Sequence, residues 1–109
     1  MFYISSNKFD LTHQVMSFMS KIYPNLNDVD IEVIPTDLTG DNVFGWTLEN
    51  NDQNEIEIHH DLSDKDYITT LIHELIHVDQ NVRGLRDDDQ RENEAYNLEG
   101  TYYQQYINA

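Results

Sequence analysis

Cysteine is absent from the chain, which excludes both disulfide bonds and zinc sites built from thiolates. This absence is consistent with a reducing compartment. No apolar run approaches the roughly 20 residues that a membrane span requires. The short apolar start, residues 1–4, is interrupted at once by Ser5, so no secretory signal is predicted. We therefore expect a soluble, cytoplasmic protein that has no membrane partner.

Basic residues are also scarce. The 109 residues include six Lys and Arg against 21 Asp and Glu, which gives a formal net charge of −15. Such a chain repels a phosphate backbone, so nucleic-acid binding is not expected. Most of the carboxylates fit a solvated acidic shell, and together they would attract a basic substrate. The length suits one domain that spans residues 1–109 and has a modest core, and a monomer is assumed.

Apolar periodicity divides the first half of the chain into one helix and three strands. Apolar side chains at helical spacing predict a helix over 10–23, with Asp10 as its N-cap. Short runs of β-forming residues, with a polar turn at 50–54 before the last run, predict a small sheet. The predicted strands are residues 31–35, 43–49 and 55–59. Trp46 is expected to belong to the core.

The second half of the chain predicts two helices. Ser63 is a favourable N-cap and Gly84 suits a helix end, so one helix is expected from Ser63 to about Arg83. An acidic loop, residues 86–89, precedes a final helix over about 90–107. The expected fold is therefore α+β, with an N-terminal helix, a small three-stranded sheet and two C-terminal helices.

Residues 73–77 read His-Glu-Leu-Ile-His, which is the HExxH pattern. Positions four apart share one face of a helix, so His73 and His77 can direct neutral imidazoles at one Zn²⁺ ion. Glu74 is offset by one position and can stand beside the ion as the base that takes a proton from its water. Chance predicts about 0.02 such matches in a chain of this composition, which makes this motif the most informative feature of the sequence.

A third metal ligand is expected downstream, because catalytic zinc sites usually have three protein ligands and Gly84 reverses the chain. No histidine follows His77, so the candidates are carboxylates of the last helix. Glu92 and Glu94 lie about 200° apart on a helix, so only one of them can face the ion. Their spacing does not choose between them. Glu99 is expected to be an exposed helix residue.

Two segments carry a family resemblance, HELIHVDQ at 73–80 and RENEAYNLE at 91–99. They resemble the gluzincin metallopeptidases, above all the small HExxH proteins of bacteriophage genomes, in which HExxHxxQ is followed by E-x-E-A-Y. They are also similar to the larger family of ImmA/IrrE-like peptidases. The resemblance extends over residues 55–100. It implies a minimal zincin-like fold with an HExxH active-site helix and a C-terminal glutamate helix, a zinc cofactor and peptidase activity.

The resemblance also implies roles for individual residues. In gluzincins the ligating glutamate has a small residue three positions later, so Ala95 marks Glu92 as the ligand. Many gluzincins have an acid four positions after the ligand that orients a histidine, and here Tyr96 occupies that position. Outside these segments, His59 and His60 end the third predicted strand. Neighbouring strand residues face opposite ways, so at most one of the two could reach the cleft and hold a transition-state oxygen.

These features predict a zinc-dependent metallopeptidase that hydrolyses peptide bonds. The zincin-like arrangement implies that a peptide or protein substrate adds to a sheet edge, for which Glu55–Ile58 is the candidate. Glu74 would take a proton from the attacking water and deliver it to the leaving amine. The first alternative is a zincin-like domain with little or no activity that binds a protein partner. The second is a purely structural zinc site.

The acidic excess predicts that salt stabilises the metal-free protein. Raising the ionic strength from about 0.01 M to about 0.15 M shortens the Debye length from roughly 30 Å to 8 Å and so weakens the repulsion between carboxylates. We expect the melting temperature of chelator-treated protein to rise over this range in a thermal-denaturation series. An unchanged melting temperature would mean that the charges are already dispersed or paired.

Overall fold

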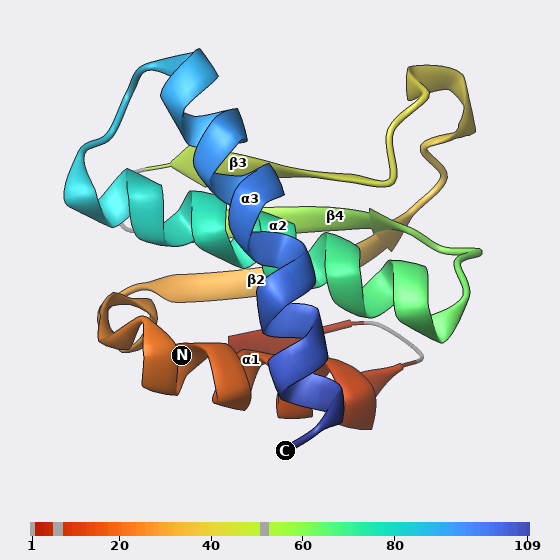
Figure 1. Ribbon diagram of the computed structural model, residues 1–109. Helices are drawn as coiled ribbons and strands as arrows, with labels where there is room; N and C mark the ends of the chain where they lie inside the picture. The colour runs from red at the N-terminus through yellow and green to blue at the C-terminus, as the bar shows by residue number, and fades with distance from the viewer. Residues whose placement is uncertain (1, 6–7, 51–52) are drawn as a thin grey trace.

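A mixed four-stranded sheet and three α-helices make up residues 2–5, 8–50 and 53–109, which are the residues described by this computed structural model (Figure 1). The predicted α+β class is confirmed. Positions 51 and 52 of the predicted turn lie outside the described residues. In chain order the elements are β1 (Phe2–Ile4), α1 (Phe9–Ile22), the 3₁₀ turn η1 (Pro24–Asp28), β2 (Asp30–Thr36), the 3₁₀ turn η2 (Thr39–Asp41), β3 (Gly45–Asn50), β4 (Gln53–His59), α2 (Asp64–Arg83) and α3 (Asp88–Ile107).

The strand order across the sheet is β1-β2-β4-β3, with β3 antiparallel to β4 and the other two pairs parallel. The prediction of three strands is wrong, because Phe2–Ile4 adds a fourth; three residues carry too little alternation to be recognised. The predicted edge at Glu55–Ile58 is also wrong. It lies in β4, which pairs with β2 on one side and β3 on the other, so the edge strand on this side of the sheet is β3.

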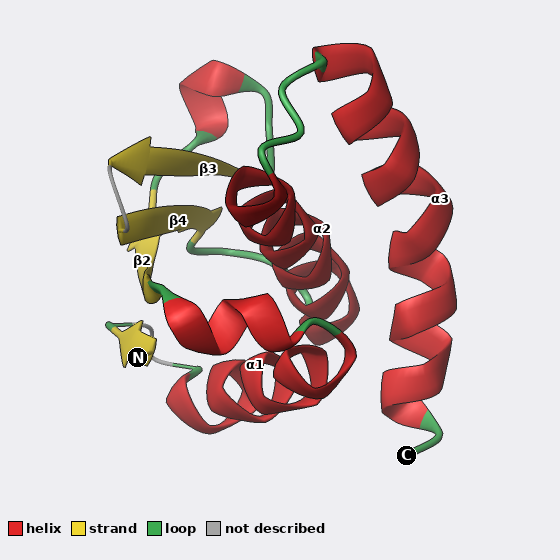
Figure 2. Cartoon of the chain, turned by 90° about the vertical axis from the view of Figure 1, so that its left-hand side faces the viewer, coloured by secondary structure: helices red, strands yellow, loops and turns green. Residues whose placement is uncertain are grey.

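All three helices lie on the same face of the sheet (Figure 2). The central helix α2 contacts β3 and β4 on one side and is covered by α3 on the other, while α1 packs beside it. Because it is enclosed from two sides, α2 is buried over most of its length. No helix in the described ranges is both long enough and apolar enough to cross a membrane. The fully buried core side chains come from the sheet, from α1 and the turn after it, from α2 and, at one position, from α3. They are Val15, Met16, Met19, Leu26, Ile31, Val33, Ile56, Leu71, Ile72, Leu75, Ile76, Val78 and Ala95.

The ends of α2 follow the predicted capping chemistry. The Ser63 hydroxyl accepts a hydrogen bond from the backbone N–H of Asp66 at 3.2 Å, which satisfies one of the free donors of the first turn. Gly84 ends the helix in the left-handed region at φ 77°, where a side chain would be strained. These two residues fix the length of the helix that carries the motif.

The other two helices begin at positions that differ from the prediction. Lys8 occupies the N-cap position of α1, so the expected cap Asp10 lies in the first turn instead. The last helix starts at Asp88, inside the predicted acidic loop. It does so because the Asp87 side chain accepts a hydrogen bond from the backbone N–H of Gln90 at 2.9 Å, and because carboxylates are favoured at a helix N-terminus.

Trp46 lies outside the core, contrary to the prediction, and is half-buried. Side chains of β3 alternate between the two faces of the sheet, so Thr47 points toward α2 and Trp46 points away. The indole N–H of Trp46 donates a hydrogen bond to the Glu57 carboxylate on β4 at 2.8 Å. The indole thus ties the edge strand to its neighbour on the face that the helices leave open.

Gly45 allows β3 to approach α2 closely. A Cβ atom at this position would lie 2.8 Å from Cγ2 of Thr70 on α2 and 3.0 Å from the carbonyl oxygen of Glu57. The first of these neighbours belongs to α2, and the second is backbone of β4 and cannot turn aside. The absence of a side chain at Gly45 therefore sets the distance between the edge strand and the motif helix, and it brings Thr47 within reach of Glu74.

Replacing Gly45 by alanine should destabilise the protein by about 1–3 kcal/mol, the usual cost of an extra methyl group in a packed contact. Gly100→Ala is the matched control, because an added Cβ there meets no atom within 4 Å. Alanine is the better helix former, so this variant should gain about 0.5–1 kcal/mol. Urea denaturation measures both changes, and a neutral or stabilising Gly45→Ala would contradict the close approach.

Candidate metal centre

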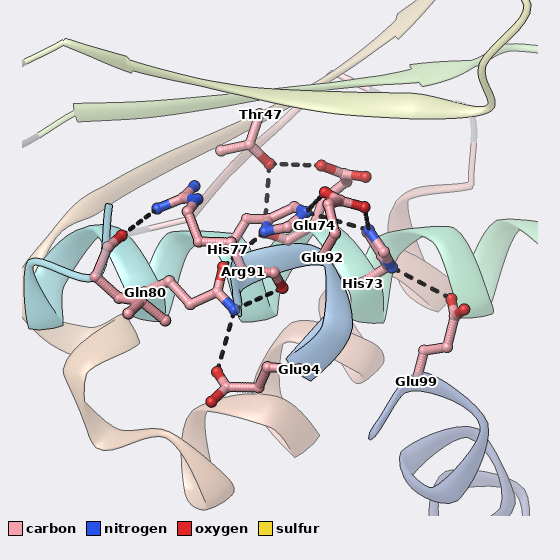
Figure 3. Close-up of polar contacts among 10 residues, drawn as sticks. Thr47, His73, Glu74, His77, Gln80, Arg91, Glu92, Glu94 and Glu99 are labelled. Atoms are coloured by element: carbon pink, nitrogen blue, oxygen red, sulfur yellow. Dashed lines mark hydrogen bonds and ion pairs between the residues drawn. The ribbon is translucent and has the colours of Figure 1, made fainter. Parts of the chain in front are cut away.

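Two histidines of α2 and one glutamate of α3 meet where the two helices cross (Figure 3). The Nε2 atoms of His73 and His77 lie 3.1 Å apart, and both side chains are buried. Oε1 of Glu92 is 2.8 Å from Nε2 of His77, and its Oε2 is 3.5 Å from Nε2 of His73. The structure therefore brings together the two motif histidines and one of the two glutamates that the sequence left as candidates.

The separations between these donor atoms suit a tetrahedral ion. Two ligands at about 2.0–2.1 Å from zinc lie roughly 3.3–3.4 Å apart when their bonds enclose a tetrahedral angle. The three observed separations, 2.8, 3.1 and 3.5 Å, bracket that value. Two imidazole nitrogens and one carboxylate are also a donor set used by hydrolytic zinc sites. On both counts the residues fit a zinc ion.

Gln80 holds His77 in the orientation that such a site needs. It is fully buried, and its amide nitrogen donates to the carbonyl oxygen of Arg91 at 3.0 Å and to Glu94 at 3.1 Å. Because its donors are committed, its Oε1 must accept the proton on Nδ1 of His77, which lies 2.7 Å away. This tautomer leaves the lone pair of Nε2 directed at His73 and Glu92.

Glu94 faces away from the two imidazoles and belongs to a separate group of charges. It pairs with Arg83 of α2. It also accepts a hydrogen bond from the amide of Gln80 (Figure 3). Burial by itself would raise the pKa of Glu94, but the hydrogen bonds from Gln80 and Arg83 hold it below its usual value. Glu94 therefore stays ionised and supports the amide that orients His77.

Glu99 lies beside His73, contrary to the expectation that it would be an exposed helix residue. It is half-buried, and its Oε2 is 3.4 Å from Nδ1 of His73. Burial and the charge of Glu92 raise the pKa of Glu99. Tyr96, which stands where gluzincins have an orienting acid, stacks edge-on against the His73 ring at 4.8 Å between centroids. The acid beside Nδ1 of His73 is thus Glu99, which lies one turn after Tyr96 on α3.

Glu74 lies on the side of α2 that faces β3. It is 5% exposed, and its Oε1 accepts a hydrogen bond from the Thr47 hydroxyl at 2.9 Å. Burial raises the pKa of Glu74 to about 7, although the charge of His77 and the hydrogen bond from Thr47 oppose the rise. Burial and the neighbouring His77 also lower the pKa of His73, which favours the neutral ring that can bind a metal.

A cavity of about 730 Å³ opens over His73, Glu74, His77 and Glu92. One wall is the segment 42–47, which leads into β3, and the opposite wall is the first three turns of α3. Val43, Phe44 and Tyr96 border the cavity with exposed apolar side chains. The site therefore combines buried polar groups at its base with an apolar rim.

His59 and His60 do not border this cavity, so neither fills the role considered for one of them. Nδ1 of His59 accepts a hydrogen bond from the backbone N–H of Leu38 at 3.1 Å, and the two histidine rings lie 4.8 Å apart. With Asp37 they form a second group of possible metal donors, mostly exposed. The Leu38 amide already occupies the accepting nitrogen of His59, which weakens the case for a metal there.

The sequence motif predicted His73 and His77 as donors, and the family resemblance predicted Glu92, but neither gave a role to the residues that hold these donors in place. Gln80 ends the HExxHxxQ pattern, and its position three residues after His77 could have indicated its role. Glu99 could have been found as the carboxylate two turns after Glu92. The contact of Thr47 with Glu74 depends on strand order and has no local signal in the sequence.

No family model, no curated protein and no solved structure matches this chain.

Proposed function

We propose that the protein is a zinc-dependent metallopeptidase. The observation that carries the proposal is the convergence of His73, His77 and Glu92 beside the buried carboxylate of Glu74, at the base of an open cavity. A structural zinc site would account for the three donors. It would not account for a buried carboxylate whose pKa is raised to about 7 and which lies next to them, because burying such a group costs free energy.

His73, His77 and Glu92 would hold the zinc ion, which when bound polarises a carbonyl group and makes water a stronger acid. Glu74 would accept a proton from the attacking water and later donate it to the leaving amine. A pKa near 7 suits a group that must perform both transfers near neutral pH. Thr47 would keep the Glu74 carboxylate turned toward the cavity through its 2.9 Å hydrogen bond.

The proposed substrate is an extended peptide that pairs with the free edge of β3. This strand replaces the edge at Glu55–Ile58 that the sequence suggested. Its backbone lies along the cavity, with Gly45 and Thr47 in the wall. Main-chain hydrogen bonds would supply the binding, and the apolar rim at Val43 and Phe44 would contact substrate side chains. The net charge of −15 favours basic peptides.

A second candidate function is a zincin-like domain that binds a protein partner without cleaving it. Peptidases of the zincin type usually have a second lobe that forms one wall of the substrate cleft. Here only α3 and the segment 42–47 form the walls of the cavity, and the described residues include no further lobe. This favours the alternative. The two functions make different use of Glu74, so they can be separated by changing this residue.

Glu92→Ala should weaken zinc binding by more than the roughly 10–100-fold that the loss of an outer hydrogen bond costs, because it removes a ligand. Glu94→Ala is the matched control: it removes the same type of side chain from the same helix, and we expect a loss within that range. In the parent, zinc should raise the melting temperature because it ties α3 to α2. Calorimetric zinc titration and thermal denaturation measure these effects, and a larger loss in Glu94→Ala would contradict the assignment.

Glu74→Gln should retain zinc and lose hydrolysis by about 10²–10⁴-fold, the usual contribution of a general base. The assay is digestion of a peptide library read by mass spectrometry, with the parent, the chelated parent and Glu74→Gln compared side by side. Equal cleavage by all three would indicate a contaminating protease. If the parent binds zinc tightly and cleaves nothing, the partner-binding alternative replaces the enzyme.

A further inference from the structure

The face of the sheet opposite the helices is open. Figure 2 shows α1, α2 and α3 on one side, and no described element covers the other side. A sheet face of this kind is normally apolar where it meets another layer and polar where it meets water. Here the open face is mixed, because it carries two neighbouring carboxylates with an exposed apolar side chain on either side of them.

The strand register places four side chains of the open face in one row. Tyr3 of β1 is paired with Glu32 of β2, Glu32 with Glu55 of β4, and Glu55 with Leu48 of β3. Side chains at paired positions point to the same face of the sheet. The row therefore reads aromatic, acid, acid, aliphatic from one edge of the sheet to the other.

The two central acids of this row are placed against each other. Like charges at directly opposed positions destabilise a sheet. The neighbouring acid Glu57 accepts hydrogen bonds from Trp46 and Thr36, but no such bond or ion pair joins Glu32 or Glu55 within residues 2–5, 8–50 and 53–109. No lysine or arginine lies in any of the described strands; all six belong to helices or loops. Among the described residues, therefore, no basic side chain neutralises the pair.

The row also borders a hollow of about 350 Å³, together with Asp30, Asn50, Gln53 and Asn54. Tyr3 is 48% exposed and Leu48 is 50% exposed, so an apolar surface flanks the acids on both sides. This arrangement is complementary to a long basic side chain. Its charged end would meet Glu32 and Glu55, and its aliphatic stem would lie on the flanking surface. The ring of Tyr3 would add a cation–π contact.

We propose that the open face of the sheet docks a basic segment of a partner protein, with an arginine or lysine side chain seated between Glu32 and Glu55. Charge complementarity selects the partner, because Glu32 and Glu55 lie side by side on this face and none of the described strands contains a lysine or arginine. The surface lies on the opposite side of the sheet from the candidate metal centre, so this inference does not depend on the proposed peptidase function.

The test is a titration of the full chain, with a chelator present to prevent hydrolysis, followed by ¹⁵N amide NMR. The probe is acetyl-Val-Arg-Val-Arg-Val-amide, and the same peptide with glutamate in place of arginine is the ligand control. We expect shifts that cluster at Tyr3, Glu32, Leu48 and Glu55 with the basic peptide and none with the acidic one. Shifts confined to residues around His73 and Phe44 would place the peptide in the metal-centre cavity and overturn the proposal.

The double variant Glu32→Gln/Glu55→Gln should bind the basic peptide about tenfold more weakly, the loss expected from two partly exposed ion pairs. Its melting temperature should rise by about 2–5 °C, because the opposed charges are removed. A measured rise would exclude a folding defect as the cause of lost binding, and a fall would contradict the repulsion on which the proposal rests. The control Asp61→Asn/Asp89→Asn makes the same charge change at exposed positions outside the sheet, one in the loop after β4 and one in α3. Equal weakening in both variants would show attraction by net charge alone and overturn the proposal.

Discussion

The enclosure of α2 between the sheet and α3 is the constraint on which the rest of the structure depends. A helix covered from one side can turn its polar residues to water, but α2 cannot, and His73, His77 and Gln80 are buried with it. Buried polar groups must find partners within the protein. Here these partners come from α3, whose fully buried Ala95 lets the two helices approach. The same contact that closes the fold thus assembles the candidate metal centre.

Gln80 connects this centre to the rest of the helical layer. Its amide reaches Glu94, Glu94 pairs with Arg83, and Arg83 pairs at 2.7 Å with the buried carboxylate of Asp79. Asp79 also accepts from Asn25 in the turn η1 at 3.2 Å. A continuous set of polar contacts therefore runs from His77 to a turn far along the chain. Such networks hold one arrangement of side chains well, because each member left unpaired would cost free energy.

The parts of this protein that could be predicted from sequence are those fixed by local geometry. The pairing of His73 with His77 follows from the pitch of a helix, and the caps at Ser63 and Gly84 follow from backbone chemistry. The strand order could not be predicted, because β1 is too short to show a period and a parallel crossover leaves no local signal. For the same reason the contact between Thr47 and Glu74 was not foreseen, since it depends on which strand lies at the edge. The choice between Glu92 and Glu94 required the rotation of α3, which long-range packing sets.

An open sheet face flanked by Tyr3 and Leu48 would ordinarily favour self-association, because exposed strands and apolar patches tend to stack. Glu32 and Glu55 change this outcome. If two copies met through this face, two acidic pairs would be brought together and dehydrated in one interface, with no lysine or arginine of the described strands to offset them. On the proposed role, the row would act by repulsion as well as attraction: it would disfavour a second copy of its own surface and leave that surface open to a molecule of opposite charge.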